Sequence, residues 1–153
     1  LCPAINYVIC SEEFAQKALG IKDEINVKDH TLVEDIYNQL FTKLNLSHPK
    51  NTLVITLGAE GCYYGNKQFM PSYNVCTAID TTGAGDIFHG AFMHGILEYN
   101  DLVSALTFAS VVAGLSTGKM GGIPSIPDQV IVEQHLHRAI NVQNNVFKLI
   151  KKP

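Results

Sequence analysis

The segment that most constrains the fold is a continuous apolar run from Leu53 to Leu57. The run is rich in β-branched residues, which favour strands, and it lacks the polar–apolar alternation of a strand with one face in water. We therefore expect a strand that is covered on both faces and lies in the centre of a sheet. Parallel sheets have helices on both faces, so this run predicts a layered α/β fold with a mostly parallel sheet.

Strand and helix signals alternate along the rest of the chain, in agreement with this fold class. Residues 5–9 form a short apolar run typical of a strand, and Ser11 is suited to cap a helix over Glu12 to Leu19 that ends at Gly20. Further helices are expected at 32–44, 86–97 and 102–115 and at the tail, and those at 86–97 and 102–115 should be largely buried. A hairpin is expected at 62–70, followed by an extended segment at 73–79.

Length and composition favour one globular domain. The chain has 153 residues, of which 46% are hydrophobic and 16% charged, so residues 1–153 are expected to fold as a single α/β domain. The net charge of -3 argues against a general nucleic-acid or membrane-surface binder, because such proteins usually carry a basic face. We therefore expect neither nucleic acid nor a membrane as partner.

The cysteines and the apolar runs indicate the cellular setting. The four cysteines, Cys2, Cys10, Cys62 and Cys76, lack the paired spacing of a zinc site and the density of a disulfide scaffold, so reduced thiols are expected. No apolar run approaches the length of a membrane span, and the start of the chain lacks the pattern of a signal peptide. The expected location is cytoplasmic.

The chemistry is expected in Asp80-Thr81-Thr82-Gly83-Ala84-Gly85-Asp86, which leads directly into an apolar segment with helical spacing. Small residues at a helix start let a ligand approach free N–H groups, and the helix dipole favours a phosphate there. A carboxylate beside a bound phosphoryl group can orient an acceptor hydroxyl and take its proton. Two plainer explanations remain: Asp86 caps a helix, and the glycines form a tight turn.

The same residues, continued by Phe88, Gly90 and Ala91, resemble the C-terminal signature of the ribokinase-like (PfkB) sugar kinases. The resemblance implies a ribokinase-like fold, an ATP-dependent phosphotransferase, Asp86 as the catalytic base, and Gly83, Ala84 and Gly85 as the anion hole. An aspartate is a weak base, so its main role would be orientation of the hydroxyl. Thr56, Gly58 and Gly61 resemble the family's nucleotide-contacting segment, although a plain strand-ending turn is the alternative.

The resemblance also implies metal sites. Asp80, Thr82 and Ser125 match positions that bind a monovalent cation in ribokinase-like enzymes, with carbonyls near Ser116, Lys119 and Gly121 completing the shell. Oxygen ligands suit a hard cation such as K⁺, and whether this chain uses potassium stays open. Mg²⁺ is expected to arrive with ATP, but its protein ligands cannot be named. Many family members carry an Asn-x-x-Glu motif, and the corresponding residues here are Ser11-Glu12-Glu13-Phe14. Glu12 and Glu13 are more simply first-turn charges favoured by the helix dipole.

Kinases of this family are longer, and their sugar-binding residues lie largely in the amino-terminal half. We therefore expect this chain to be the C-terminal, nucleotide-binding and catalytic part of a kinase, inactive in isolation, with ATP and a sugar or sugar-like alcohol as partners of the whole. A nucleoside or sugar-phosphate kinase and a catalytically incomplete nucleotide-binding fragment are the alternatives. Exposed sheet edges or apolar faces would favour a homodimer or other self-association. The acceptor and the position phosphorylated stay open.

Overall fold

The computed structural model describes the backbone of residues 5–73 and 75–150 and the side chains of residues 5–73 and 75–139. By their contacts the residues divide into two compact units, Leu1–Ser72 and Tyr73–Pro153, and each unit is described by itself. The expectation of one domain over residues 1–153 stays a prediction.

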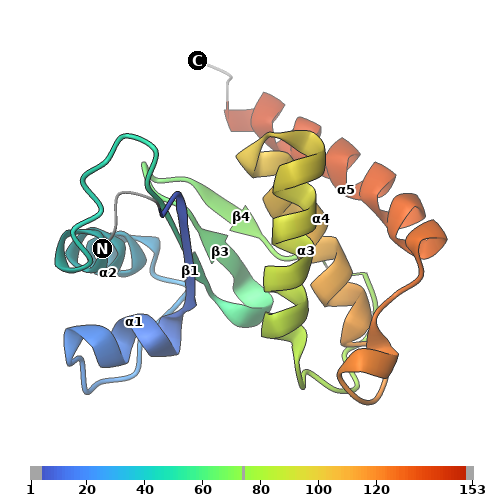
Figure 1. Cartoon of the computed structure of the whole chain (residues 1–153), viewed down its shortest axis with the longest axis horizontal. Coiled ribbons are helices and arrows are strands. Elements are labelled where there is room, and N and C mark those ends of the chain that lie inside the picture. Colours follow the sequence, from blue (N-terminus) through green and yellow to red (C-terminus); the bar gives the residue numbers. More distant parts are fainter. Residues whose placement is uncertain (1–4, 74, 151–153) are drawn as a thin grey trace. The chain divides into compact units, whose positions relative to one another are not determined.

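The first unit is a four-stranded sheet with two helices (Figure 1). Its elements are β1 (Tyr7–Ser11), α1 (Glu12–Leu19), α2 (His30–Lys43), β2 (Thr52–Thr56), the short 3₁₀ helix η1 (Gly58–Glu60), β3 (Gly61–Tyr63) and β4 (Phe69–Pro71). The strands lie in the order β1-β2-β3-β4; β1 and β2 are parallel, and the other two pairings are antiparallel. The α/β class is confirmed, and the hairpin lies where it was expected. Only one of the three pairings in the described sheet is parallel, so the expectation of a mostly parallel sheet is not met in this part of the chain.

Local capping explains where the helices of this unit begin and end. The Ser11 side chain accepts a hydrogen bond from the Phe14 N–H at 3.2 Å, and Gly20 ends α1 in the left-handed conformation with φ 74°. Asp29 caps α2 by accepting from the N–H groups of Thr31 and Leu32. Each cap satisfies backbone groups that a helix end leaves without partners. The predicted start and end of α1 are therefore confirmed, whereas β1 lies two residues later than predicted.

The core of the first unit lies between one face of the sheet and its two helices. Figure 1 shows α1 and α2 side by side against the strands. Val33, Ile36 and Leu40 from α2 meet Leu53 and Ile55 from β2, and all five side chains are almost completely buried. Val54, which points to the opposite face, is also fully buried, so β2 is covered on both faces as predicted.

The cysteines described in the structure are free thiols: Cys10 and Cys62 are buried, and Cys76 is half-buried. Burial raises the pKa of Cys10 to about 11, with a smaller contribution from the Glu12 charge, and raises the pKa of Cys62 to about 12. The expectation of reduced, mostly buried thiols is confirmed for these three; Cys2 lies outside the described residues.

The second unit is helical. It contains α3 (Ala84–Tyr99), α4 (Leu102–Ser116), the 3₁₀ helix η2 (Ile123–Ser125) and α5 (Gln129–Ile150). Helix α4 packs against both α3 and α5, and a Cβ on Gly95 would stand only 3.0 Å from the Ala105 Cα, so α3 and α4 approach closely there. The predicted helix pair and helical tail are confirmed.

The expected burial of α3 is wrong. Helix α4 is largely buried, but α3 exposes Met93 and Leu97, whose side chains are 62% and 85% accessible. Residues 73 and 75–79 belong to no strand, and the extended segment expected at 73–79 stays a prediction. Instead, the N–H groups of Ile79 and Asp80 both donate to the Thr117 carbonyl, at 2.7 and 3.0 Å, so the end of α4 supplies the acceptor that a neighbouring strand would have supplied.

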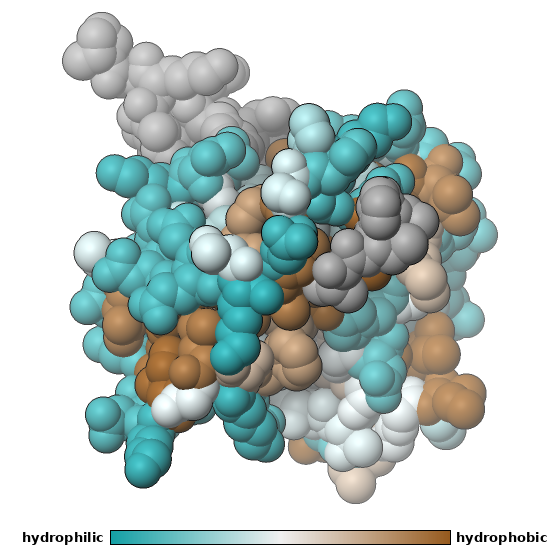
Figure 2. All heavy atoms as spheres, turned by 60° about the vertical axis from the view of Figure 1, so that its left-hand side comes forward, coloured by the Kyte–Doolittle hydropathy of each residue, from teal (hydrophilic) through white to brown (hydrophobic). Residues whose placement is uncertain are grey.

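Hydrophobic side chains also reach the surface of the molecule. Figure 2 shows one face on which they form patches separated by hydrophilic residues. The most exposed large one in the first unit is Phe14, at 50%. Within the part of the chain that the structure describes, every helix is too short or too polar to cross a membrane.

Candidate functional site

The glycine motif forms the turn that starts α3. Gly83 is the N-cap residue and adopts φ 76°, a left-handed conformation that glycine accepts without steric cost. A Cβ at this position would stand 3.5 Å from the Gly122 Cα, so the turn lies against the loop that follows α4. The Ala84 N–H closes the turn by donating to the Thr81 carbonyl at 3.1 Å.

This turn leaves several backbone donors unused. Among the described residues, the N–H groups of Gly83, Gly85 and Asp86 meet no acceptor, whereas the Ala84 N–H is engaged and the Ile87 N–H begins the helical ladder at Gly83. Unpaired N–H groups at a helix start carry a partial positive charge and can bind an anion. Ala84 was expected to contribute a donor of this kind; in this structure its N–H is already used.

Gly85 faces open space. A Cβ built on it meets no atom within 4 Å, and its φ lies outside the left-handed region. The protein therefore gives no steric or conformational reason for a glycine here, whereas Gly83 has one. A ligand that approaches the backbone at Gly85 would supply such a reason.

Asp86 does not cap the helix. The cap is Gly83, and Asp86 is the third residue of α3, with its side chain exposed. The capping explanation for this aspartate is therefore wrong, although a carboxylate in the first turn is still favoured by the helix dipole. Together with Gly83, Asp86 lines one end of a cavity of about 840 Å³ in the second unit.

Asp80 joins the two loops beside this helix start. One carboxylate oxygen accepts the Gly121 N–H at 2.8 Å, and the other accepts the Thr82 N–H at 2.9 Å. Hydrogen bonds to the carboxylate hold the pKa of Asp80 below its ordinary value of 3.8. The bond from the Gly121 N–H has the largest effect, followed by those from the backbone and the hydroxyl of Thr82. The carboxylate is thus fixed in place as an anion.

The residues at the end of α4 and after it that are implied for a cation site make hydrogen bonds that do not involve Asp80, apart from Gly121. Ser125 is buried and donates its hydroxyl to the Gly122 carbonyl at 2.6 Å; Ser116 is also buried and donates to the Ala113 carbonyl at 2.7 Å. The Lys119 N–H donates to the Ser116 carbonyl at 3.3 Å. Carboxylate, hydroxyl and carbonyl oxygens of this kind fit a hard cation such as K⁺.

The residues implied for nucleotide contact in the first unit have different environments. The Thr56 hydroxyl donates to the Cys10 carbonyl at 3.3 Å. Gly58 is exposed with φ 56° and open space around its Cβ position. Gly61 is buried with φ 118°, and its Cβ would lie 2.0 Å from the Met70 carbonyl oxygen. Sheet packing explains Gly61, so Gly58 is the position of the three at which a ligand can approach the backbone freely.

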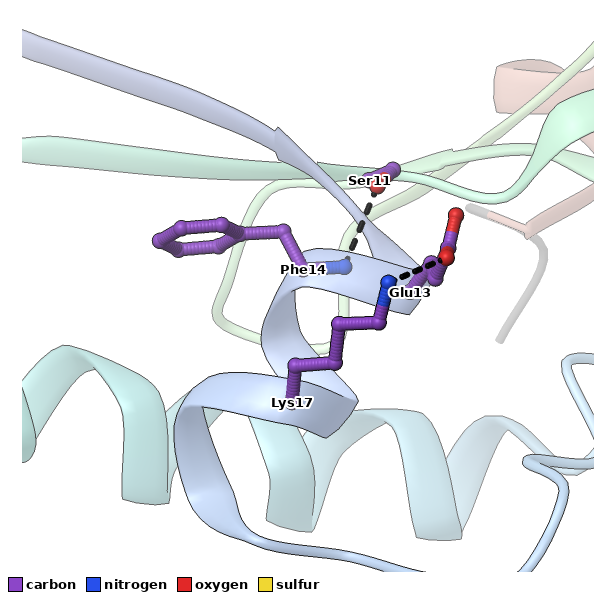
Figure 3. Close-up of polar contacts among 4 residues, drawn as sticks. All are labelled: Ser11, Glu13, Phe14 and Lys17. Carbon is purple, nitrogen blue, oxygen red and sulfur yellow. Dashed lines mark hydrogen bonds and ion pairs between the residues drawn. The ribbon is translucent and has the colours of Figure 1, made fainter.

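Ser11 and Glu13, which stand in the stretch corresponding to the family's Asn-x-x-Glu, have local partners (Figure 3). Ser11 caps α1 through Phe14, and Glu13 pairs with Lys17 at 2.6 Å on the exposed side of the same helix. The bond to Lys17 and its charge lower the pKa of Glu13. The first-turn role expected for this glutamate agrees with the structure.

The cavity beside Asp86 was not predicted. Four of its lining residues follow one another at intervals of four along α3, namely Asp86, Gly90, His94 and Glu98, and so share one helix face. This spacing is visible in the sequence and could have indicated the face. Which residues stand opposite depends on α5, and the order of residues does not give that.

Comparisons with known proteins agree with the signature. The model of the pfkB family of carbohydrate kinases matches residues 1–129. Fructokinase-1 of Zea mays is 32% identical over an alignment of 126 residues, with 76% of this chain and 38% of the relative covered. Fructokinase-1 of Oryza sativa is 33% identical over 139 residues, with 79% and 42% covered.

A solved structure supports the fold. The ribokinase of Arabidopsis thaliana, solved with ribose and ATP, superposes with a TM-score of 0.70 at 25% identity, over 87% of this chain and 41% of that one. The chain thus spans about 40% of the length of the relatives it matches. Because the family model covers most of the sequence, the chain belongs to the pfkB family of carbohydrate kinases.

Proposed function

We propose that this chain carries the nucleotide-binding and catalytic part of an ATP-dependent sugar kinase. The observation that carries the proposal is the start of α3, where free N–H groups at Gly83, Gly85 and Asp86 surround an open glycine and an exposed carboxylate. Free donors and a helix dipole favour phosphoryl oxygens, and a carboxylate beside them can orient an acceptor hydroxyl and take its proton, which supports the proposal.

In the proposed reaction, an acceptor hydroxyl oxygen attacks the γ-phosphorus of ATP. A new P–O bond forms, the bond to the bridging β–γ oxygen breaks, and ADP leaves with that electron pair. Asp86 orients the hydroxyl and takes its proton. The N–H groups of Gly83 and Gly85 stabilise the charge on the transferred phosphoryl oxygens.

Metal ions would assist at two places. Mg²⁺ bound to ATP would neutralise charge on the β- and γ-phosphates. A monovalent cation would be held by Asp80, Thr82 and Ser125 with carbonyls near Ser116, Lys119 and Gly121, and its role would be to support the turn that presents Gly83. Rates measured in potassium and in a large inert cation would test this second site, and equal rates would remove it.

The acceptor is proposed to be a free sugar or a sugar-like alcohol. The names of the relatives, fructokinases and a ribokinase solved with ribose and ATP, support this class. Thr56, Gly58 and Gly61 are the further ATP contacts we propose, with Gly58 the one best placed by its open surroundings. A nucleoside or sugar-phosphate kinase is the alternative within the family.

The proposal is tested by nucleotide binding and turnover. We expect this chain to bind ATP without turnover, and a longer form that includes the rest of a kinase to phosphorylate a member of a sugar panel. In that active form, Asp86→Asn should lower turnover about 10²- to 10⁴-fold and leave ATP affinity nearly unchanged, because the amide keeps the shape but cannot take a proton.

Asp101→Asn is the matched control. Asp101 also stands at a helix start in the second unit, where its side chain accepts the Ser104 N–H at 2.8 Å, and asparagine caps helices equally well. Turnover of this control should equal that of the unaltered protein. Near-normal turnover by Asp86→Asn would refute the catalytic role, and absence of ATP binding by a folded chain would refute the nucleotide site.

A further inference from the structure

The cavity that begins at Asp86 extends well beyond the phosphate site. Helix α4 forms its floor with Phe108 and Val112, because α4 packs against the helices on either side. Helix α3 forms one wall and α5 the other, while residues 122–127 close one end. The volume of about 840 Å³ lies within the range of small-molecule sites.

The far end of this cavity is acidic. Glu98 from α3 and Glu133 from α5 line it, and the lining residues include no lysine or arginine. Within residues 75–139 of this unit, no ion pair involves either glutamate; Glu133 accepts only the Gln129 side-chain amide at 2.8 Å. Two carboxylates without a cation therefore face one space, an arrangement that favours a positively charged occupant.

The charges of both carboxylates affect the phenol of Tyr99, which also lines the cavity. Burial raises the pKa of its phenol, and the charges of Glu98 and then Glu133 raise it further. The two glutamates belong to different helices, and both line this cavity together with Tyr99.

Aromatic rings stand beside the carboxylates. The rings of His94 and Phe108 lie 5.3 Å apart and those of Tyr99 and Phe108 lie 5.9 Å apart, which forms a continuous aromatic wall. Flat aromatic surfaces accept apolar groups, and their faces attract cations. The cavity therefore combines a place for an apolar group with a place for a positive charge.

One wall of the cavity comes from α5. The family model ends at residue 129, whereas Val132, Glu133 and Leu136 of α5 lie beyond it. We propose that this cavity binds a small organic cation with an aromatic or branched apolar group, its ammonium held by Glu98 and Glu133. The volume fits a small molecule, and binding of a second copy of the chain is one of the outcomes that the test distinguishes.

The test uses three probes of similar size on the whole 153-residue chain: 2-phenylethylammonium, neutral 2-phenylethanol and anionic 3-phenylpropionate. Calorimetry should show that the cation binds at least about tenfold more tightly than the alcohol, because only the cation replaces the missing positive charge. The carboxylate should not bind. Chemical-shift changes should map to α3, α4 and α5.

Charge-neutral variants identify the carboxylates. Glu98→Gln and Glu133→Gln should each weaken binding of the cation by about threefold and leave the alcohol unaffected, a size expected for a partly exposed ion pair. Glu24→Gln, which removes an exposed charge from the first unit, is the control and should change neither affinity. Thermal unfolding should confirm that all three variants fold.

Equal affinity for the cation and the alcohol would overturn the proposal, and so would unchanged cation binding in both glutamine variants. Self-association that shifts the same resonances without any probe would assign the cavity to a second copy instead, and would equally overturn it. The inference does not depend on phosphoryl transfer: cation binding is measured without ATP, so its failure leaves the kinase proposal intact.

Discussion

Substitution of Gly85 separates a ligand-imposed glycine from a fold-imposed one. A Cβ on Gly85 meets no protein atom within 4 Å, and the residue needs no left-handed backbone. Valine in helices is slightly better tolerated than glycine, by about 0.4 kcal/mol. Gly85→Val should therefore fold with a melting temperature equal to or slightly above that of the unaltered chain.

The same substitution should damage nucleotide binding. The branched side chain would occupy the space in front of the free Gly85 and Asp86 N–H groups. A hydrogen bond to a charged group contributes about 1.5–3 kcal/mol, so loss of one such bond corresponds to about 10- to 100-fold weaker binding of ATP. Calorimetric titration of ATP into the folded variant measures this directly.

Gly90→Val is the matched control. Gly90 lies in the same helix, and its Cβ position is equally open, but it stands four to five residues, just over one turn, beyond the free N–H groups of Gly85 and Asp86. Its ATP affinity should stay within about twofold of the unaltered chain. Equal ATP affinity in Gly85→Val and Gly90→Val would refute the anion site, since both variants add the same bulk to the same helix.

Three further substitutions test the loops. Asp80→Asn should lower the melting temperature at neutral pH. Because the folded pKa of Asp80 is depressed, the stabilisation that its carboxylate gives is complete above pH 3.8 and is lost as the pH falls through the folded pKa. The melting temperatures of the variant and the unaltered chain should therefore converge in acid. A constant difference down to the lowest pH would contradict this. Gly61→Ala should destabilise the fold by more than about 2 kcal/mol, because its Cβ would overlap the Met70 carbonyl, whereas Gly58→Ala should cost only about 1 kcal/mol. Urea unfolding compares them, and equal losses would exclude the steric reason.

Features that depend on neighbouring residues in sequence were predictable. Ser11 and Gly20 set the limits of α1 because capping and left-handed glycine ends involve only the adjacent turn. The start of α3 was placed two residues late, because a glycine cap leaves no side-chain signal and Asp86 looked like the capping residue. The local rule was sound, but it was applied to the wrong position.

Features that depend on distant packing were not predictable. Both α3 and α4 are apolar around most of their circumference, which predicted burial for both, yet Leu97 of α3 is 85% accessible. Hydrophobicity shows that a helix can be buried and does not show what is available to cover it. Similarly, the family resemblance named Asp80 and Gly121 separately, and only the fold brings the Asp80 carboxylate to the Gly121 N–H, 41 positions away.

This contact explains how an irregular segment can hold a site in place. Among the described residues of the second unit no strand supports the turn at Gly83, and within this unit the turn lies against the loop after α4. Thr117 accepts the Ile79 and Asp80 N–H groups, and the Asp80 carboxylate accepts Gly121. These bonds fix both sides of the turn before any ligand arrives. Donors that are already oriented need no rearrangement to stabilise an anion, and such preorganisation is the property that phosphoryl transfer requires.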